Sequence, residues 1–119
     1  MPDESLDLLR GTLDLLILRA LRVQQTHGYG VLRWIEQATD QALRIEEGSL
    51  YPALYRLEHR GWITSEWGVS ENNRRARFYR LTKKGRDRLE LEIDTFVRFS
   101  QAMFRALALA PSGLSRETA

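Results

Sequence analysis

The sequence of 119 residues contains no cysteine, which removes several kinds of chemistry at once. Without a thiol, the protein forms no disulfide and has no thiolate nucleophile or cysteine-ligated zinc site. Histidine is scarce too, and His27 and His59 both lack the i, i+4 partner of a helical metal site. We therefore expect no metal and no cofactor. The absence of cysteine is also consistent with a reducing compartment.

Long apolar runs are missing as well. The most apolar segment, Leu13–Leu21, is interrupted by Asp14 and Arg19, whereas a membrane-spanning helix needs roughly 20 apolar residues. The first nine residues, MPDESLDLL, are acidic and lack the basic start of a signal peptide. These two absences favour a soluble, cytoplasmic protein without a membrane partner.

Signals for catalysis are equally weak. Ser49 has no nucleophile-elbow pattern around it. Gly28 and Gly30 form a G-x-G, but they follow a predicted helix rather than a strand. We therefore interpret them as packing positions rather than a nucleotide loop. The sequence predicts a protein that is not an enzyme.

The net charge of +2 conceals an uneven distribution along the chain. Residues 1–43 carry four basic and six acidic groups, and residues 89–119 carry three and four. Residues 44–88 carry eleven basic and six acidic groups, a local net charge of +5. Such a region is typical of a surface that meets a polyanion, although a solvated basic face would give the same pattern.

Apolar spacing predicts three short helices in the first half of the chain. The first covers about residues 6–24. The second begins near Tyr29 and ends around residues 39–40, and its inward residues are Val31, Leu32, Ile35 and Ala38. The third begins between Glu46 and Ser49 and ends before Gly61, and its core face is Leu50, Ala53, Leu54 and Leu57. Three helices of this length predict a helix-turn-helix core.

Two segments rich in aromatic and β-branched residues, 62–67 and 76–81, flank the polar loop GVSENNRR. This pattern predicts a two-stranded hairpin, with Tyr79 and Leu81 on one face and Phe78 and Arg80 on the other. A helix-turn-helix followed by a hairpin is the order of a winged helix. The predicted fold class is therefore mainly α, an α+β winged helix with a two-stranded β-wing.

Thr82 can cap a final helix that continues to about Ala110, where Pro111 stops it. Such a helix is roughly 40 Å long, and a symmetric homodimer would cover its heptad-like apolar seam most simply. We divide the chain into a winged-helix DNA-binding domain (1–81), a C-terminal dimerisation helix (82–110) and a disordered tail (111–119). The seam consists of Leu89, Ile93, Phe96, Val97, Ser100, Met103, Phe104 and Leu107.

The outward residues of the third helix and of the hairpin are candidate DNA contacts. An α-helix fits the major groove, and the outward residues here are Ser49, Tyr51, Pro52, Tyr55 and Arg56. Tyr51 and Tyr55 could instead pack against neighbouring elements. The wing would contact phosphates or the minor groove through Asn72, Asn73, Arg74, Arg75 and Arg77. A charged hairpin tip can also be merely solvated.

The middle of the last helix carries a second candidate site. Against its dimer mate, this aromatic stripe could enclose a flat apolar ligand. Residues at helical spacing also form plain dimer cores, and the sequence leaves both interpretations open. The residues concerned are Ile93, Phe96, Val97, Phe99, Ser100, Met103 and Phe104.

Four stretches together resemble the PadR family of bacterial transcriptional regulators: LRGTLDLLILRAL (9–21), HGYGVLRWI (27–35), EGSLYPALYRLEHRGWI (47–63) and RRARFYRLTKKG (74–85). With its single final helix, the chain is similar to the short branch of that family. The resemblance implies a winged-helix homodimer, usually a repressor, that binds double-stranded DNA at a pseudo-palindromic operator. It also implies a response to small hydrophobic molecules.

The same resemblance implies roles for individual residues. The recognition-helix motif falls on Ser49, Leu50, Tyr51, Pro52, Tyr55 and Arg56, and the basic wing falls on Arg74, Arg75 and Arg77. In short members that bind drugs, an aromatic residue of the last helix forms the dimer pocket. Phe96 stands near that position, where tryptophan is the best-known choice. The competing interpretation is a winged helix used for protein–protein contact, without a specific operator.

Overall fold

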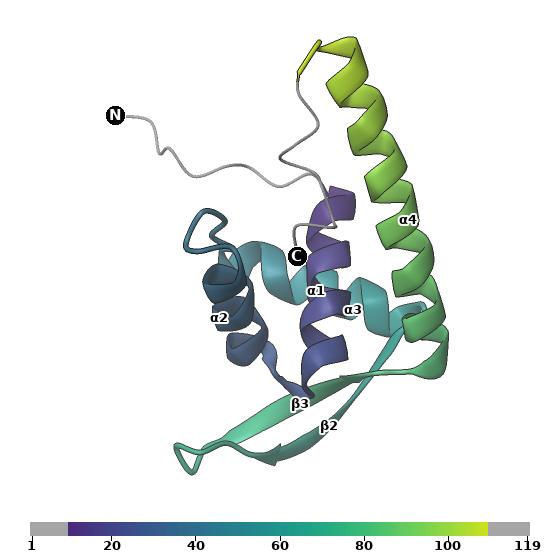
Figure 1. Ribbon diagram of the computed structural model, residues 1–119. Helices are drawn as coiled ribbons and strands as arrows, with labels where there is room; N and C mark the ends of the chain where they lie inside the picture. Colours follow the sequence, from purple (N-terminus) through teal and green to yellow (C-terminus); the bar gives the residue numbers. More distant parts are fainter. Residues whose placement is uncertain (1–9, 110–119) are drawn as a thin grey trace. The chain divides into compact units, whose positions relative to one another are not determined.

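The computed structural model describes residues 10–109, a mainly helical chain with one small antiparallel sheet (Figure 1). Three helices come first, followed by a hairpin and a long final helix, so the predicted winged-helix order is confirmed. Within this range, no helix combines the length and apolar character needed to cross a membrane. The elements are α1 (Arg10–Val23), β1 (Thr26–His27), α2 (Gly28–Ala38), α3 (Glu47–His59), β2 (Ile63–Val69), β3 (Arg75–Leu81) and α4 (Lys83–Ala106).

The core lies where the apolar faces of α1, α2 and α3 meet. Along α3, Leu50, Leu54 and Leu57 recur at helical spacing and are at most 1% exposed. Burial of each such side chain contributes about 1.5–3 kcal/mol. Ala38, which the spacing predicted to point inward, is exposed. It is the last residue of α2, and the buried stripe of that helix ends one turn earlier at Ile35.

Three helices end in the same backbone arrangement. In each, a residue with positive φ follows the helix, and the next N–H donates to the carbonyl five residues earlier. This turn ends α4 at Ala106, four residues before the predicted Ala110, because the chain reverses before Pro111 can act. The positive-φ residues are Asp40 (52°), Gly61 (80°) and Ala108 (58°). The closing bonds are Gln41–Glu36 (2.7 Å), Trp62–Leu57 (3.1 Å) and Leu109–Phe104 (2.9 Å).

The sheet has three strands in the order β1-β3-β2, whereas the sequence predicted two. β2 and β3 form the expected hairpin, with Ile63 opposite Leu81 at its base and Val69 opposite Arg75 near its tip. The additional strand β1 is only two residues long, too short to show a period of two in the sequence. Tyr79 and Leu81 face the core and Arg80 faces outward, as predicted.

His27 ends β1 and caps α2. Its Nδ1 accepts a hydrogen bond from the Gly30 N–H at 3.1 Å, which satisfies one of the free donors at the helix start. A Cβ on Gly30 would collide with the Thr26 side chain, and a Cβ on Gly28 would lie 2.8 Å from the Tyr51 hydroxyl. The G-x-G is therefore a packing feature, as predicted.

The described residues divide between Leu89 and Glu90 into two compact units. α4 begins in the first unit, where the Thr82 hydroxyl accepts the Gly85 N–H at 3.0 Å and caps the helix as predicted. Leu89, two turns along α4, is 1% exposed. The first two turns of α4 thus belong to the winged-helix core. The predicted domain limits at residues 81 and 110 stay predictions, and the tail 111–119 lies outside the described residues.

Candidate nucleic-acid interface

The outward face of α3 carries the side chains that its spacing predicted. Tyr55 is 72% exposed and Tyr51 is 48% exposed, while Ser49 and Pro52 are also exposed. Leu50, which the family motif includes, is fully buried, so it supports the helix from within and offers no surface to a partner. The exposed face of α3 therefore carries small and aromatic residues, several with a hydroxyl group, and the opposite face of the helix packs in the apolar core.

The two tyrosines of α3 differ in how they are held. Tyr55 stacks on His59 one turn later, with ring centroids 6.2 Å apart and planes within 13°. Tyr51 reaches back over the start of α2, where its ring excludes a Cβ at Gly28. Tyr51 therefore has the packing role that the sequence left open, and it still keeps about half of its surface exposed.

Arg56 does not project freely from α3. Its Nη2 lies 2.7 Å from Asp14 Oδ1 of α1, in a hydrogen-bonded ion pair whose two side chains are 31% and 16% exposed. This pair ties α3 to α1. The spacing along α3 could not show it, because Asp14 lies 42 residues earlier in the chain. The Nη2 group of Arg56 is therefore already bonded to a carboxylate and is not available to a base while that pair is formed.

The wing tip is the loop of residues 70–74, between the end of β2 and the start of β3. The Ser70 N–H donates to the Arg74 carbonyl at 2.8 Å, and the Asn73 N–H donates to the Ser70 carbonyl at 2.8 Å. Asn73 has φ 60°, a left-handed conformation that asparagine tolerates better than most residues. Asn73 therefore shapes the turn, while Asn72 and Arg74 stand exposed at its edge.

Trp67 of β2 organises the two arginines of β3 that share its face. The Arg75 guanidinium carbon lies 4.3 Å from the centre of the Trp67 ring, and that of Arg77 lies 5.4 Å from it. Trp67 itself is 53% exposed. Our prediction of the site omitted Trp67, although the alternation of arginines on the opposite strand was a usable signal.

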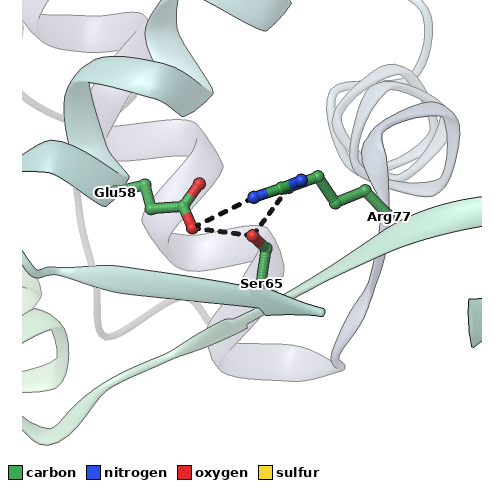
Figure 2. A network of polar contacts seen from close by, with 3 residues as sticks. All are labelled: Glu58, Ser65 and Arg77. Atoms are coloured by element: carbon green, nitrogen blue, oxygen red, sulfur yellow. Dashed lines mark hydrogen bonds and ion pairs between the residues drawn. The ribbon is translucent and has the colours of Figure 1, made fainter. Parts of the chain in front are cut away.

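Arg77 makes further contacts with Ser65 and Glu58, shown in Figure 2. Its Nε donates to Ser65 Oγ at 2.8 Å, and the Ser65 hydroxyl donates to Glu58 Oε2 at 2.7 Å. Arg77 Nη2 also lies 3.8 Å from the same carboxylate oxygen. The network joins the last turn of α3 to both strands of the wing. Neither Glu58 nor Ser65 was among the predicted site residues.

A cavity of about 550 Å³ is lined by residues of the wing, of the start of α2 and of α3. The buried Tyr79 is one of the residues that line this cavity, and burial raises the pKa of Tyr79 above its ordinary value of 10.0. The Arg77 charge opposes this rise, and Glu58 and Tyr51 add to it. Aromatic rings beside guanidinium groups suit a sugar–phosphate chain. The residues that line the cavity include Tyr29, Tyr51, Trp67, Arg74, Arg75 and Arg77.

The second candidate site, on α4, is an apolar stripe. Phe96, Phe99 and Met103 are 42%, 56% and 41% exposed, and they recur on one side of the helix. Ile93, Val97 and Phe104 are half-buried, while Ser100 is buried. In the part of the chain that the structure describes, no group of three or more His, Asp or Glu side chains is placed to hold a metal ion.

An exposed helix face beside a cationic hairpin defines a winged-helix DNA-binding protein. Comparison with known families makes this specific: the Transcriptional regulator PadR-like family matches residues 17–91. The chain belongs to that family. It is therefore a DNA-binding transcription regulator, and the expectation that it is not an enzyme is confirmed.

The chain is also similar to individual proteins and solved structures. The chain is similar to the structure of a transcriptional regulator from Clostridium thermocellum, with 30% identity and a TM-score of 0.74 over 81% of this chain and 93% of that one. It is also similar to a PadR family transcriptional regulator from Eggerthella lenta DSM 2243, with 30% identity and a TM-score of 0.69 over 82% and 83% of the two chains. Uncharacterized protein X of Lysinibacillus sphaericus is 31% identical over 80 residues, which are 67% of this chain and 73% of that protein.

Proposed function

We propose that the protein is a homodimeric repressor that binds a pseudo-palindromic operator. One observation carries the proposal: Tyr51 of α3 and the wing residues Arg74 and Arg75 line the same cavity. A helix lying in the major groove would place an adjacent phosphodiester chain against that cavity. Base contacts then fall to Ser49 and Tyr55 on the exposed face of α3, and phosphate contacts fall to the wing.

The homodimer is proposed from the apolar stripe on α4. Exposed aromatic side chains in a row on one helix leave an apolar surface that water solvates poorly. A second copy of the same helix would cover this surface by an isologous contact. Two wings and two α3 helices would then face DNA with two-fold symmetry, which is the symmetry of a palindromic operator.

Relief of operator binding by a small hydrophobic ligand is the remaining part of the proposal. Phe96 and Phe99 would supply flat rings at the dimer contact, where an aromatic ligand could insert between the two copies. A ligand that binds better to one spacing of the two α3 helices shifts the equilibrium toward that spacing. If the ligand prefers a spacing that does not fit the operator, operator affinity falls. The fall is limited by the ratio of the ligand's affinities for the two spacings.

A binding titration tests the proposed function. Labelled fragments of the DNA beside the gene are titrated with the full chain at several salt concentrations, and the tightest fragment is footprinted. We expect protection of an inverted repeat, with affinity at least about 1,000-fold above that for unrelated DNA of equal length. Equal affinity for all fragments would contradict the operator and favour the protein–protein interpretation.

A substitution on α3 separates base reading from phosphate contact. Tyr55→Ala removes the most exposed aromatic ring of α3 and leaves the core untouched. We expect it to reduce the ratio of operator affinity to unrelated-DNA affinity, because a base contact contributes only at the correct sequence. Arg74→Gln serves as the matched control on the wing and should weaken both affinities alike. If Tyr55→Ala lowers the affinity for operator and for unrelated DNA by the same factor, Tyr55 does not contact the bases.

A further inference from the structure

The three arginines of the wing differ in where their charge is directed. Arg74 stands exposed beside the tip, and Arg75 lies over the exposed ring of Trp67. Arg77 alone among these three points back toward α3, where it meets Ser65 and Glu58 (Figure 2). Its positive charge is therefore matched by a carboxylate of the same chain. A phosphate would have to displace that carboxylate to gain the same contact.

The network lies where the hairpin leaves the core. On the core-facing side of β2, Ile63 is buried and Ser65 is half-buried, whereas Trp67 is exposed. On β3, Tyr79 opposite Ser65 is buried, and Arg77 is exposed one step further out. Ser65 and Arg77 therefore join the hairpin to α3 at the point where its strands pass from buried to exposed. Beyond Tyr79, toward the tip, β3 pairs with β2 alone.

Each member of the network comes from a different element. Glu58 belongs to the last turn of α3, Ser65 to β2 and Arg77 to β3. Both strands are thereby tied to the helix whose outer face carries the proposed base contacts. A change in the angle between α3 and the wing would break the 2.7 Å hydrogen bond from Ser65 to Glu58 or the 3.8 Å ion pair between Arg77 and Glu58.

We propose that Arg77 is a positioning residue, which fixes the wing to α3 through Ser65 and Glu58 and makes no phosphate contact of its own. The phosphate contact on this face of β3 belongs to Arg75, whose guanidinium lies closer to the Trp67 ring (4.3 Å) than that of Arg77 does (5.4 Å). The network sets the distance between the two parts of the protein that meet DNA. This inference rests on the proposed DNA-binding function, and it assigns the wing arginines two separate tasks.

The salt dependence of operator binding distinguishes the two tasks. Each phosphate contact adds about one unit to the slope of log affinity against log salt. We expect Arg75→Gln to lower the slope by about one unit. Arg77→Gln should leave the slope unchanged and weaken binding about three- to tenfold, the range for a half-exposed charged hydrogen-bond network. A slope lowered by about one unit in Arg77→Gln would overturn the proposal.

A double-mutant cycle tests whether Arg77 acts through Glu58. We expect Glu58→Gln alone to weaken operator binding about as much as Arg77→Gln, and the double variant to lose little more than either single one. Losses that add fully would overturn the proposal. So would tighter binding by Glu58→Gln, because that result would mean that the carboxylate only repels the DNA. Arg75→Gln combined with Glu58→Gln is the control pair, and its losses should add.

Hydrogen exchange on the protein without DNA provides a readout that does not depend on an operator. We expect Glu58→Gln and Arg77→Gln to speed exchange of amides in β2 and β3 and to leave the amides of α1 unchanged. Unchanged exchange in the wing would overturn the positioning role. If the wild-type protein does not distinguish the operator from other DNA, the proposed function fails, and this measurement still decides whether the network holds the wing.

Discussion

Tyr79 connects the buried face of β3 to the charged side chains around it. It is 7% exposed and lies opposite Ser65, whose hydroxyl belongs to the Glu58 network. Burial is the main reason that its pKa is raised above 10.0, and the nearby Arg77 charge only partly offsets the effect. The folded protein therefore holds this phenolic proton more tightly than the unfolded chain does.

This difference predicts a loss of stability in alkali. As pH rises above about 10, the unfolded chain releases the Tyr79 proton before the folded protein does, and the free energy of unfolding falls. Below that pH both states keep the proton, so the stability is fully present. We expect the urea midpoint to fall less between about pH 8 and about pH 10.5 in Tyr79→Phe than in the wild type. Tyr55→Phe, at a 72% exposed position, is the control and should behave as the wild type; equal falls in all three proteins would contradict the prediction.

Single residues also show what the sequence could and could not predict about the site. Helical spacing correctly identified Ser49, Tyr51 and Tyr55 as outward, because exposure follows from the period of a helix. It could not show that Arg56 pairs with Asp14, or that Arg77 pairs with Glu58, because these partners lie far apart in the chain. A basic segment in the sequence predicts that the surface it forms carries positive charge. Which cations are already paired depends on the tertiary fold.

At the scale of elements, the end of α3 determines where β2 begins. The chain must reverse between His59 and Ile63, and Gly61 does so with φ 80°. The resulting hydrogen bond from the Trp62 N–H to the Leu57 carbonyl closes the helix at 3.1 Å. Because β2 starts two residues later, this turn also sets the direction in which the wing leaves the helix.

Gly61→Ala is expected to destabilise the protein by about 1 kcal/mol. The left-handed conformation costs alanine about this much free energy. No clash adds to that cost, because the new Cβ would lie 3.9 Å from its nearest neighbours, two atoms of the Lys84 side chain. Gly48→Ala is the control, because Gly48 lies inside α3 with open space around it and alanine favours a helix. Chemical denaturation measures both. A Gly61→Ala protein as stable as the wild type would show that the turn adapts without strain.

Elements with a strong period were the predictable part of the fold. The three core helices and the β2–β3 hairpin follow from apolar spacing and turn residues, and their bounds were close to those observed within residues 10–109. The predicted start of the first helix near residue 6 lies outside the described residues. β1 escaped prediction because two residues carry no period, and it exists only because β3 offers it hydrogen-bonding groups. The early end of α4 escaped as well, because Ala108 adopts a positive φ that its residue type does not suggest.

At the scale of the whole molecule, charge and apolar surface occupy different parts of the chain. The basic excess lies in residues 44–88, whereas the exposed aromatic stripe lies on α4 beyond residue 95. A dimer formed through the stripe on α4 would therefore use residues other than those of the basic segment. The two proposed tasks, assembly and DNA contact, then use separate residues and can be disrupted one at a time.

Phe99→Glu tests the proposed dimer. The side chain is 56% exposed, so the charge should not unfold the protein, but a pair of carboxylates at an isologous contact would repel each other. We expect sedimentation to show a dimer for the wild type and a monomer for Phe99→Glu at micromolar concentration, with a large loss of operator affinity. Gln101→Glu introduces the same group at an exposed position outside the stripe and should remain dimeric. A dimeric Phe99→Glu would place the contact elsewhere.

The short strand β1 divides the hairpin into two mechanical regions. At Phe78 and Tyr79, β3 has a hydrogen-bonded neighbour on each side, whereas from Arg77 to its tip it has only β2. A ribbon of two strands bends and twists more easily than a sheet of three. The wing therefore has a stiff base, which keeps its register, and a compliant tip. Such a tip can follow a surface whose width varies while the helices beneath it stay still.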